Sequence, residues 1–156
     1  MILTRAAAPL LIVLALAGCA TATPDAATTP DTSSTSDTCD VRVLVDFGTL
    51  GADPIDDCAS AGIAADSLTA AGVTTEGTAD YGDQVICRVN EEPAPADETC
   101  ATLPADFYWA LWVKSSADAE WEYAQEGAAT LQLDTGQSLA LVYTDAADAD
   151  PAPPQD

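Results

Sequence analysis

The reactive side chains of this 156-residue chain exclude most catalytic chemistries. The sequence contains no histidine, so neither a Ser-His pair, a Cys-His pair nor a histidine general base can be assembled. Lys114 precedes Ser115 and Ser116, but neighbouring residues of a strand point to opposite faces, which argues against a Ser-Lys dyad. We therefore expect a protein that is not an enzyme, with no catalytic residue and no cofactor.

Two groups of aspartates could still carry chemistry. The stretch LQLDTGQS at 131–138 matches the Asp-Thr-Gly pattern of aspartic proteases in a single copy, so two chains would have to share one site. The same residues are an ordinary turn between strands, which is the interpretation we favour. Asp53, Asp56 and Asp57 could offer oxygens to calcium, but no EF-hand spacing accompanies them. No metal site is predicted.

Aromatic side chains are the most concentrated feature, since six of the nine lie within residues 107–127. If 107–113 is a strand and 119–127 its hairpin partner, alternate side chains share a face. One face then carries the predicted core residues Phe107, Trp109, Leu111 and Val113. The other carries the candidate ligand-binding residues Tyr108, Trp112, Trp121 and Tyr123, which we call the aromatic platform. Alternatively, loops cover this second face and make it a minor core.

Five cysteines place the chain in an oxidising compartment. Cys19 follows the export signal described below, which leaves an even set of four for two disulfides. Cys87 and Cys100 bracket a polar loop that a disulfide would close, leaving Cys39 to pair with Cys58; the crossed pairings stay open. With no C-x-x-C pair and no histidine, zinc is not expected.

The N-terminus carries an export signal at residues 1–18. A charged start and an apolar run too short for a membrane span are followed by Leu-Ala-Gly-Cys at 16–19. This motif looks like the lipobox of bacterial lipoproteins, which predicts a lipid on Cys19 and anchoring at the outer face of the cell membrane. The alternative is a plain secreted protein.

Composition divides the rest of the chain into three parts. Residues 19–38 contain Ala, Thr, Ser, Pro and Asp without large apolar side chains, which predicts a disordered tether. Residues 39–145 have the length of one domain, and residues 146–156 form a second disordered segment, the C-terminal tail.

A formal net charge of −22 restricts the partners of the chain. Nucleic acid is excluded, because phosphate binding needs clustered Lys and Arg, whereas only Arg42, Arg88 and Lys114 follow the signal. The acidity serves solubility, or it attracts cationic ligands. The partners we expect are the membrane, through the lipid on Cys19, and a small molecule or an envelope protein.

Hydrophobic periodicity predicts an α+β domain with one helix on a mostly antiparallel sheet. Val41, Val43, Val45 and Phe47 alternate as in a strand with one buried face, 48–57 reads as turn-rich, and 85–89 reads as another strand. Residues 58–73 contain a helix with Gly72 at its C-terminal end. Residues 129–144 read as two short strands joined by the turn at 134–136.

Several short motifs resemble a known family. They are Asp-Phe-Gly at 46–48 after the first strand, SLTAAGV at 67–73, CRVNEEP at 87–93, Tyr-Trp-x-x-Trp at 108–112 and Trp121-x-Tyr123-x-x-x-Gly127. The chain looks like secreted actinobacterial proteins of a domain-of-unknown-function family related to the C-terminal domain of transcobalamin and intrinsic factor. The resemblance implies a β-grasp-like sheet cradling one helix, with cobalamin binding in some members. Glu91 departs from the pattern, standing where a turn glycine is expected.

Overall fold

The structure is a computed structural model that describes residues 39–148 and 151–155. The predicted signal peptide (1–18), Cys19 and the tether (19–38) lie outside the described residues. The elements in chain order are β1 (Val41–Asp46), the 3-10 helix η1 (Gly48–Leu50), β2 (Ile55–Ala59), β3 (Gly62–Ile63), α1 (Ala64–Ala70), β4 (Thr75–Thr78), β5 (Gly82–Val89), β6 (Phe107–Lys114), β7 (Glu122–Tyr123), β8 (Gln132–Leu133) and β9 (Ser138–Asp145).

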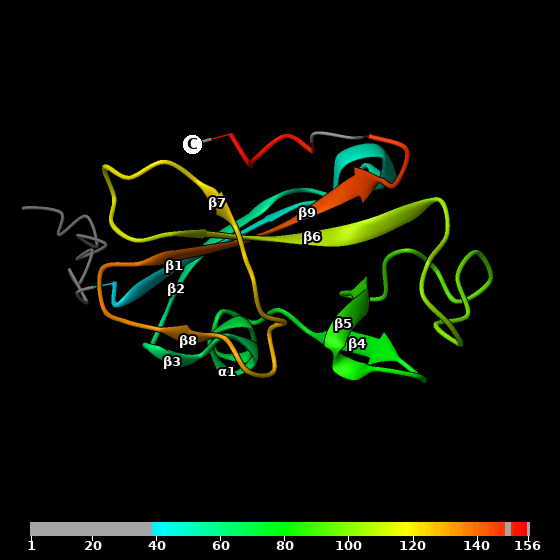
Figure 1. The fold of residues 1–156 in the computed structure, drawn as a ribbon, viewed down its shortest axis with the longest axis horizontal. Helices are drawn as coiled ribbons and strands as arrows, with labels where there is room; N and C mark the ends of the chain where they lie inside the picture. Colours follow the sequence, from blue (N-terminus) through cyan, green and yellow to red (C-terminus); the bar gives the residue numbers. More distant parts are fainter. Residues whose placement is uncertain (1–38, 149–150, 156) are drawn as a thin grey trace, which may run out of the picture. The chain divides into compact units, whose positions relative to one another are not determined.

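The principal sheet has the strand order β2-β1-β9-β6-β7 (Figure 1). β1 pairs with β9 in parallel, and the other pairings of this sheet are antiparallel. Because β1 and β9 lie inside the sheet, they are apolar on both faces: Val43 and Leu44 are both buried. The α+β class and the mostly antiparallel sheet with a single helix, predicted from the sequence, are confirmed.

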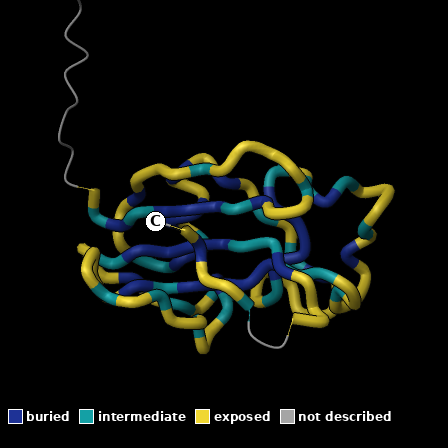
Figure 2. Tube along the Cα trace, turned by 90° about the horizontal axis from the view of Figure 1, so that it is seen from above, coloured by how far each residue is buried: buried dark blue, intermediate teal, exposed yellow. Residues whose placement is uncertain are grey.

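The main core fills the space between one sheet face and α1 (Figure 1). The valines of β1 and the leucines of β9 meet Leu68 and Ala64 of the helix there, and all of these side chains are almost fully buried. Trp109 and Leu111 of β6 belong to the same cluster, as the alternation predicts. Figure 2 shows the buried residues running along the strands, with the exposed ones mostly in the connections.

The helix ends at the predicted glycine. Gly72 has φ +76°, a left-handed conformation that glycine adopts at low cost. Its N–H donates to the carbonyl of Thr69, while the N–H of Val73 donates to that of Leu68. This pair of hydrogen bonds is a Schellman motif, and it turns the chain out of α1 towards β4.

Two disulfides join Cys39 to Cys58 and Cys87 to Cys100, as predicted. The first ties the start of β1 to β2, and the second closes the loop between β5 and β6. Buried Arg88 holds the same loop, because its guanidinium donates to the carbonyls of Pro93 and Glu98 and pairs with Glu76. Disulfides of this kind indicate an oxidising, extracytoplasmic compartment.

Two predictions about the strands were wrong, one for residues 129–144 and one for residues 48–57. The strands within 129–144 form no hairpin, because β8 pairs with β3 whereas β9 lies between β1 and β6. β2 begins at Ile55, within the stretch 48–57 that the sequence predicts to be turn-rich, and continues to Ala59. It forms at the edge of the sheet, where its charged side chains stay exposed and Arg42 pairs with Asp56.

The second sheet face carries a smaller apolar cluster. Leu44, Ala110, Trp112 and Ala140 are buried in it, with Tyr108, Trp121 and Val142 packed around them. The Cys87–Cys100 loop does not cover this face, since its residues 93, 97 and 98 line a hollow with Phe107 and Tyr143 on the first face. Residues 151–155 lie on the second face instead (Figure 1). The tail is predicted disordered, yet Pro154 is buried there.

Candidate functional site

Strand β6 positions the aromatic residues on two faces of the sheet. Phe107, Trp109, Leu111 and Val113 face α1, and Tyr108 and Trp112 face the other way, as the alternation predicts. Phe47 meets Trp109 edge to face at 5.4 Å between ring centroids, and Tyr143 packs on the same indole at 5.2 Å. Two other aromatic rings therefore contact the indole of Trp109.

The four residues of the aromatic platform do come together. Trp112 and Tyr123 are partners in the β6–β7 register, with ring centroids 5.2 Å apart. Tyr108 lies close enough to Tyr123 to contribute to the raised pKa of that tyrosine, and Trp121 packs on the cluster that contains Trp112. The residues that the sequence selected are thus neighbours in space.

The platform is less exposed than the prediction required. Trp112 is only 7% exposed, whereas Tyr123 is 41% exposed, and Tyr108 and Trp121 are half-buried. Trp112 is therefore part of a minor core, because it belongs to the same buried cluster as Leu44 of β1 and Ala140 of β9. Of the four platform residues, Tyr108 and Tyr123 line a cavity of the molecule, whereas Trp112 and Trp121 do not line it.

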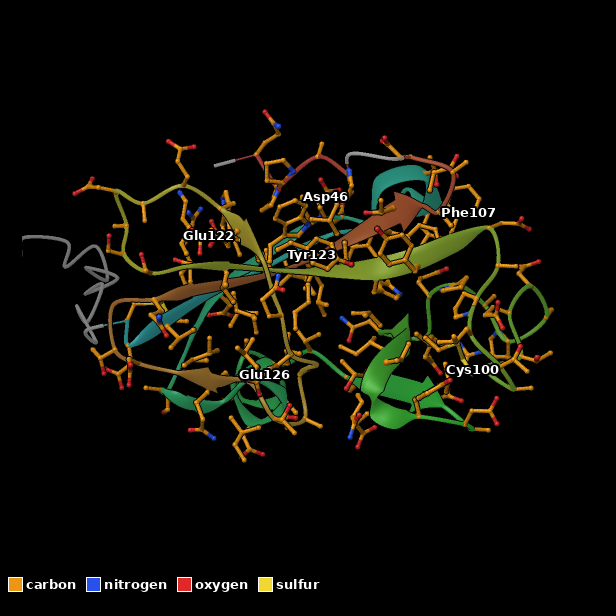
Figure 3. The ribbon with its side chains drawn as sticks, viewed as in Figure 1. Asp46, Cys100, Phe107, Glu122, Tyr123 and Glu126 are labelled. Atoms are coloured by element: carbon orange, nitrogen blue, oxygen red, sulfur yellow. A yellow bond between two sulfur atoms is a disulfide. The ribbon has the colours of Figure 1, made fainter. Side chains whose placement is uncertain are left out.

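This cavity lies at the outer edge of β6, and we call it the β6 cavity. β7 pairs only with Trp112 and Val113, so the first half of β6 has no neighbouring strand on that side among the described residues. A cavity of about 280 Å³ opens there. Its walls include Gln84, Ile86, Tyr108, Trp109, Leu111, Tyr123, Gln125, Glu126 and Gly127. Figure 3 shows Tyr123 where β7 crosses β6, with Glu126 farther along the same segment.

Gly127 allows the segment after β7 to approach β5 closely. A Cβ atom at this position would collide with the backbone carbonyl of Gln84. The close contact with β5 therefore requires a residue without a Cβ atom at this position of the sequence motif. Gly127 brings the 124–128 segment against β5 and closes one side of the β6 cavity.

The polar groups around the cavity are few. The indole N–H groups of Trp109 and Trp112 are both buried and have no hydrogen-bond partner among the described residues, so neither offers a donor to the open space of the cavity. Burial first, and then the interaction with Tyr108, raises the pKa of Tyr123 to about 12, so its hydroxyl stays protonated at neutral pH. Glu126 is the one ionisable carboxylate of the wall, and no Lys or Arg lines it.

The other side chains with possible chemistry have structural surroundings. The amine of buried Lys114 lies over the Trp121 ring, 5.1 Å from its centroid, while Ser115 and Ser116 are exposed. Residues 134–136 form the predicted turn, with Gly136 at φ +93° and its N–H donating to the carbonyl of Asp40. Neither arrangement resembles a nucleophile beside a base.

Two of the three aspartates considered for calcium make other interactions, and Asp53 is exposed. Arg42 donates to both carboxylate oxygens of Asp56, at 2.9 and 2.8 Å. These hydrogen bonds lower the pKa of Asp56. The carboxylate of Asp57 accepts the N–H of Cys58. Among the described residues, no three potential metal ligands converge.

The comparisons with known proteins found no match for this chain, whether among family models, curated proteins or solved structures. The resemblance to secreted actinobacterial proteins therefore stays a prediction. In the part of the chain that the structure describes, there is no helix with the length and apolarity needed to cross a membrane.

Several residues that line the β6 cavity were not identified from the sequence. Trp109 was assigned to the core alone, and Gln84, Gln125 and Glu126 carried no motif. They meet because β5 packs beside β6 without pairing with it, an arrangement that no local pattern indicates. Only the motif glycine, Gly127, hinted that two segments approach here.

Proposed function

We propose that the chain is an exported, lipid-anchored and non-catalytic binding protein that captures a small ligand at the β6 cavity. The observation that carries the proposal is a cavity whose described lining combines two tyrosine rings with the carboxylate of Glu126 and contains no Lys or Arg.

The chemistry of the wall favours a small cationic ligand. The face of a tyrosine ring attracts a cation, and the carboxylate of Glu126 lies on the same wall without a competing Lys or Arg. The strongly acidic chain would raise the local concentration of such a ligand. A volume of about 280 Å³ lies just below the usual range of ligand sites, roughly 300 to 1,000 Å³, which restricts the site to a small ligand. A corrinoid macrocycle is too large for this cavity.

The β-grasp-like assignment is part of the same proposal. Its support is the parallel pairing of β1 with β9 inside the sheet and the single helix packed on one face. Lipid attachment at Cys19, the signal peptide and the actinobacterial origin rest on the lipobox and the sequence motifs. The two disulfides agree with export.

Choline is a suitable probe, because it is a small quaternary ammonium ion. We expect choline to change the tryptophan fluorescence of the full chain, with Trp109 as reporter. Its neutral isostere 3,3-dimethylbutan-1-ol should bind at least about 10-fold more weakly, since it lacks the charge. Equal binding of the two compounds would rule out cation recognition.

A pair of tyrosine variants tests the location of the site. Tyr123→Ala removes a wall of the cavity and should abolish the choline response, whereas Tyr81→Ala, at a comparably exposed tyrosine elsewhere, should preserve it. If both variants respond like the unchanged chain, the ligand does not occupy the β6 cavity.

A second candidate is an envelope accessory protein without a small-molecule ligand. The burial of both Trp109 and Trp112 favours it, because these rings then serve packing rather than binding. Photo-cross-linking from Tyr123 in intact cells separates the two candidates. A specific envelope protein cross-linked there, together with no choline response, would support the accessory role.

A further inference from the structure

The second sheet face holds a larger cavity than the β6 cavity. It measures about 350 Å³ and lies beside β1 and β2, with Leu44, Val45, Ile55 and Pro54 among its lining residues. Arg42, Asp46 and Asp56 give it a charged rim. Cavities of this size hold small ligands or a few peptide side chains.

The C-terminal segment of the same chain closes one side of this cavity. Pro154 and Gln155 line it together with the sheet residues, and Figure 1 shows residues 151–155 on the side of the sheet opposite α1. Pro154 is buried, whereas its neighbours Pro153 and Gln155 are exposed. Pro154 is thus the most deeply buried residue of the segment, and Pro151 is half-buried.

The sequence of residues 151–155 favours an extended conformation that can lie along this cavity. Pro-Ala-Pro-Pro-Gln at 151–155 has three prolines, whose fixed φ angles favour an extended polyproline conformation with little entropy left to lose on binding. A preformed extended segment binds an apolar surface at a low entropic cost. The apolar lining of this cavity is aliphatic, and one of its residues, Leu44, also belongs to the buried cluster that contains Trp112.

The fit is incomplete, because about 350 Å³ stays unfilled between the segment and the sheet. A peptide that places a larger side chain beside its proline would fill this space and bind more tightly than the chain's own segment. The segment nevertheless has an advantage, since its attachment to the domain gives it an effective concentration on the order of millimolar.

From these observations we infer that the second face is a recognition site for extended, proline-rich peptides, and that residues 151–155 occupy it within the same chain. The occupant from outside is a proline-rich segment of another polypeptide, which must displace Pro154 to bind. This inference does not depend on the β6 cavity, which lies at the other edge of the sheet with different lining residues.

The test uses the full chain with Pro154→Asp, which puts a charge where an apolar ring is buried and should release the segment. Pro153→Asp is the matched control, because it adds the same charge to the same segment at an exposed position. The probe is a fluorescein-labelled peptide of sequence PAPPQ. We expect it to bind Pro154→Asp at least about 10-fold more tightly than either Pro153→Asp or the unchanged chain.

A second pair of variants locates the peptide. Ala52 is exposed and lines the cavity, so Ala52→Arg added to Pro154→Asp should block binding, whereas Ala101→Arg, at an exposed position outside the lining, should not. The methyl NMR signal of Ile55 should shift in Pro154→Asp and return when peptide is added. Peptide binding that is equal in Pro154→Asp and Pro153→Asp, or insensitive to Ala52→Arg, would overturn the inference.

Discussion

Trp109 and Trp112 show how two nearby rings of one strand acquire different surroundings. Trp109 packs among Phe47, Tyr143 and the helix side of the sheet, while Trp112 packs against Tyr123 and belongs to the same buried cluster as Leu44 on the opposite side. Both indoles are more than nine-tenths buried. Because both rings are buried, both should contribute to the stability of the fold.

Trp112→Ala is expected to destabilise the domain. Removing a buried indole leaves a cavity as well as losing its transfer free energy, which costs about 3 kcal/mol or more. Urea denaturation with the disulfides intact measures the change, with Tyr81→Ala as an exposed control. A loss below about 0.5 kcal/mol would mean that the second face is not packed as described.

Tyr123 provides a pH-dependent test at the same scale. Its pKa in the folded chain, about 12, lies above the ordinary value of 10.0, because burial and the interaction with Tyr108 disfavour the charged form. Its contribution to stability is therefore complete below about pH 10 and is lost as the pH rises towards 12. Tyrosinate absorbance should contain a component near pH 12 that Tyr123→Phe removes and Tyr81→Phe leaves. Retention of this component in Tyr123→Phe would contradict the assignment.

Among the elements, the loop between β5 and β6 is held by both a disulfide and an arginine. Arg88 lies next to Cys87 in β5, so the two side chains leave the strand on opposite sides. The disulfide reaches Cys100, and the guanidinium reaches the carbonyls of Pro93 and Glu98. The loop is therefore fixed at several points along its length.

Arg88→Met should lower the free energy of unfolding by about 3 kcal/mol, since it leaves two backbone carbonyls without their charged donor. Arg88→Lys keeps the charge but not the planar set of donors, and should lie between Met and the unchanged chain. Chemical denaturation gives the order. If Lys and Met are equally destabilising, the directional hydrogen bonds matter and the charge does not.

The whole molecule combines a disulfide-bonded domain with an N-terminal region whose role is predicted from sequence. Lipid anchoring depends on one residue in that prediction, the cysteine of the motif at 16–19. Two acyl signals are needed for stable membrane attachment, because each buried methylene contributes only about 0.8 kcal/mol.

Cys19→Ala should abolish incorporation of a palmitate analogue and either release the protein into the medium or leave the uncleaved precursor. Cys39→Ala is the matched control, because it removes a cysteine from the domain and not from the motif. Metabolic labelling followed by cell fractionation makes the measurement. Labelling that survives Cys19→Ala would disprove the lipobox.

The sequence by itself determined the features that depend on local pattern. Alternation in 41–47 and 107–113 located β1 and β6 and assigned Trp109 to the core, and Gly72 marked the end of α1. The sequence also favoured the observed disulfide pairing, because a short polar loop between two cysteines costs little entropy to close, but the structure decided against the crossed pairings.

Tertiary structure alone decided the contacts between distant segments. The parallel pairing of β1 with β9, the position of β2 at an edge, the β6 cavity and the burial of Pro154 all depend on residues far apart in the chain. Side-chain periodicity records which face of a strand is buried but not which strand lies beside it. The tail shows the same limit, since its polar composition predicts disorder until a cavity on the sheet gives Pro154 a place to pack.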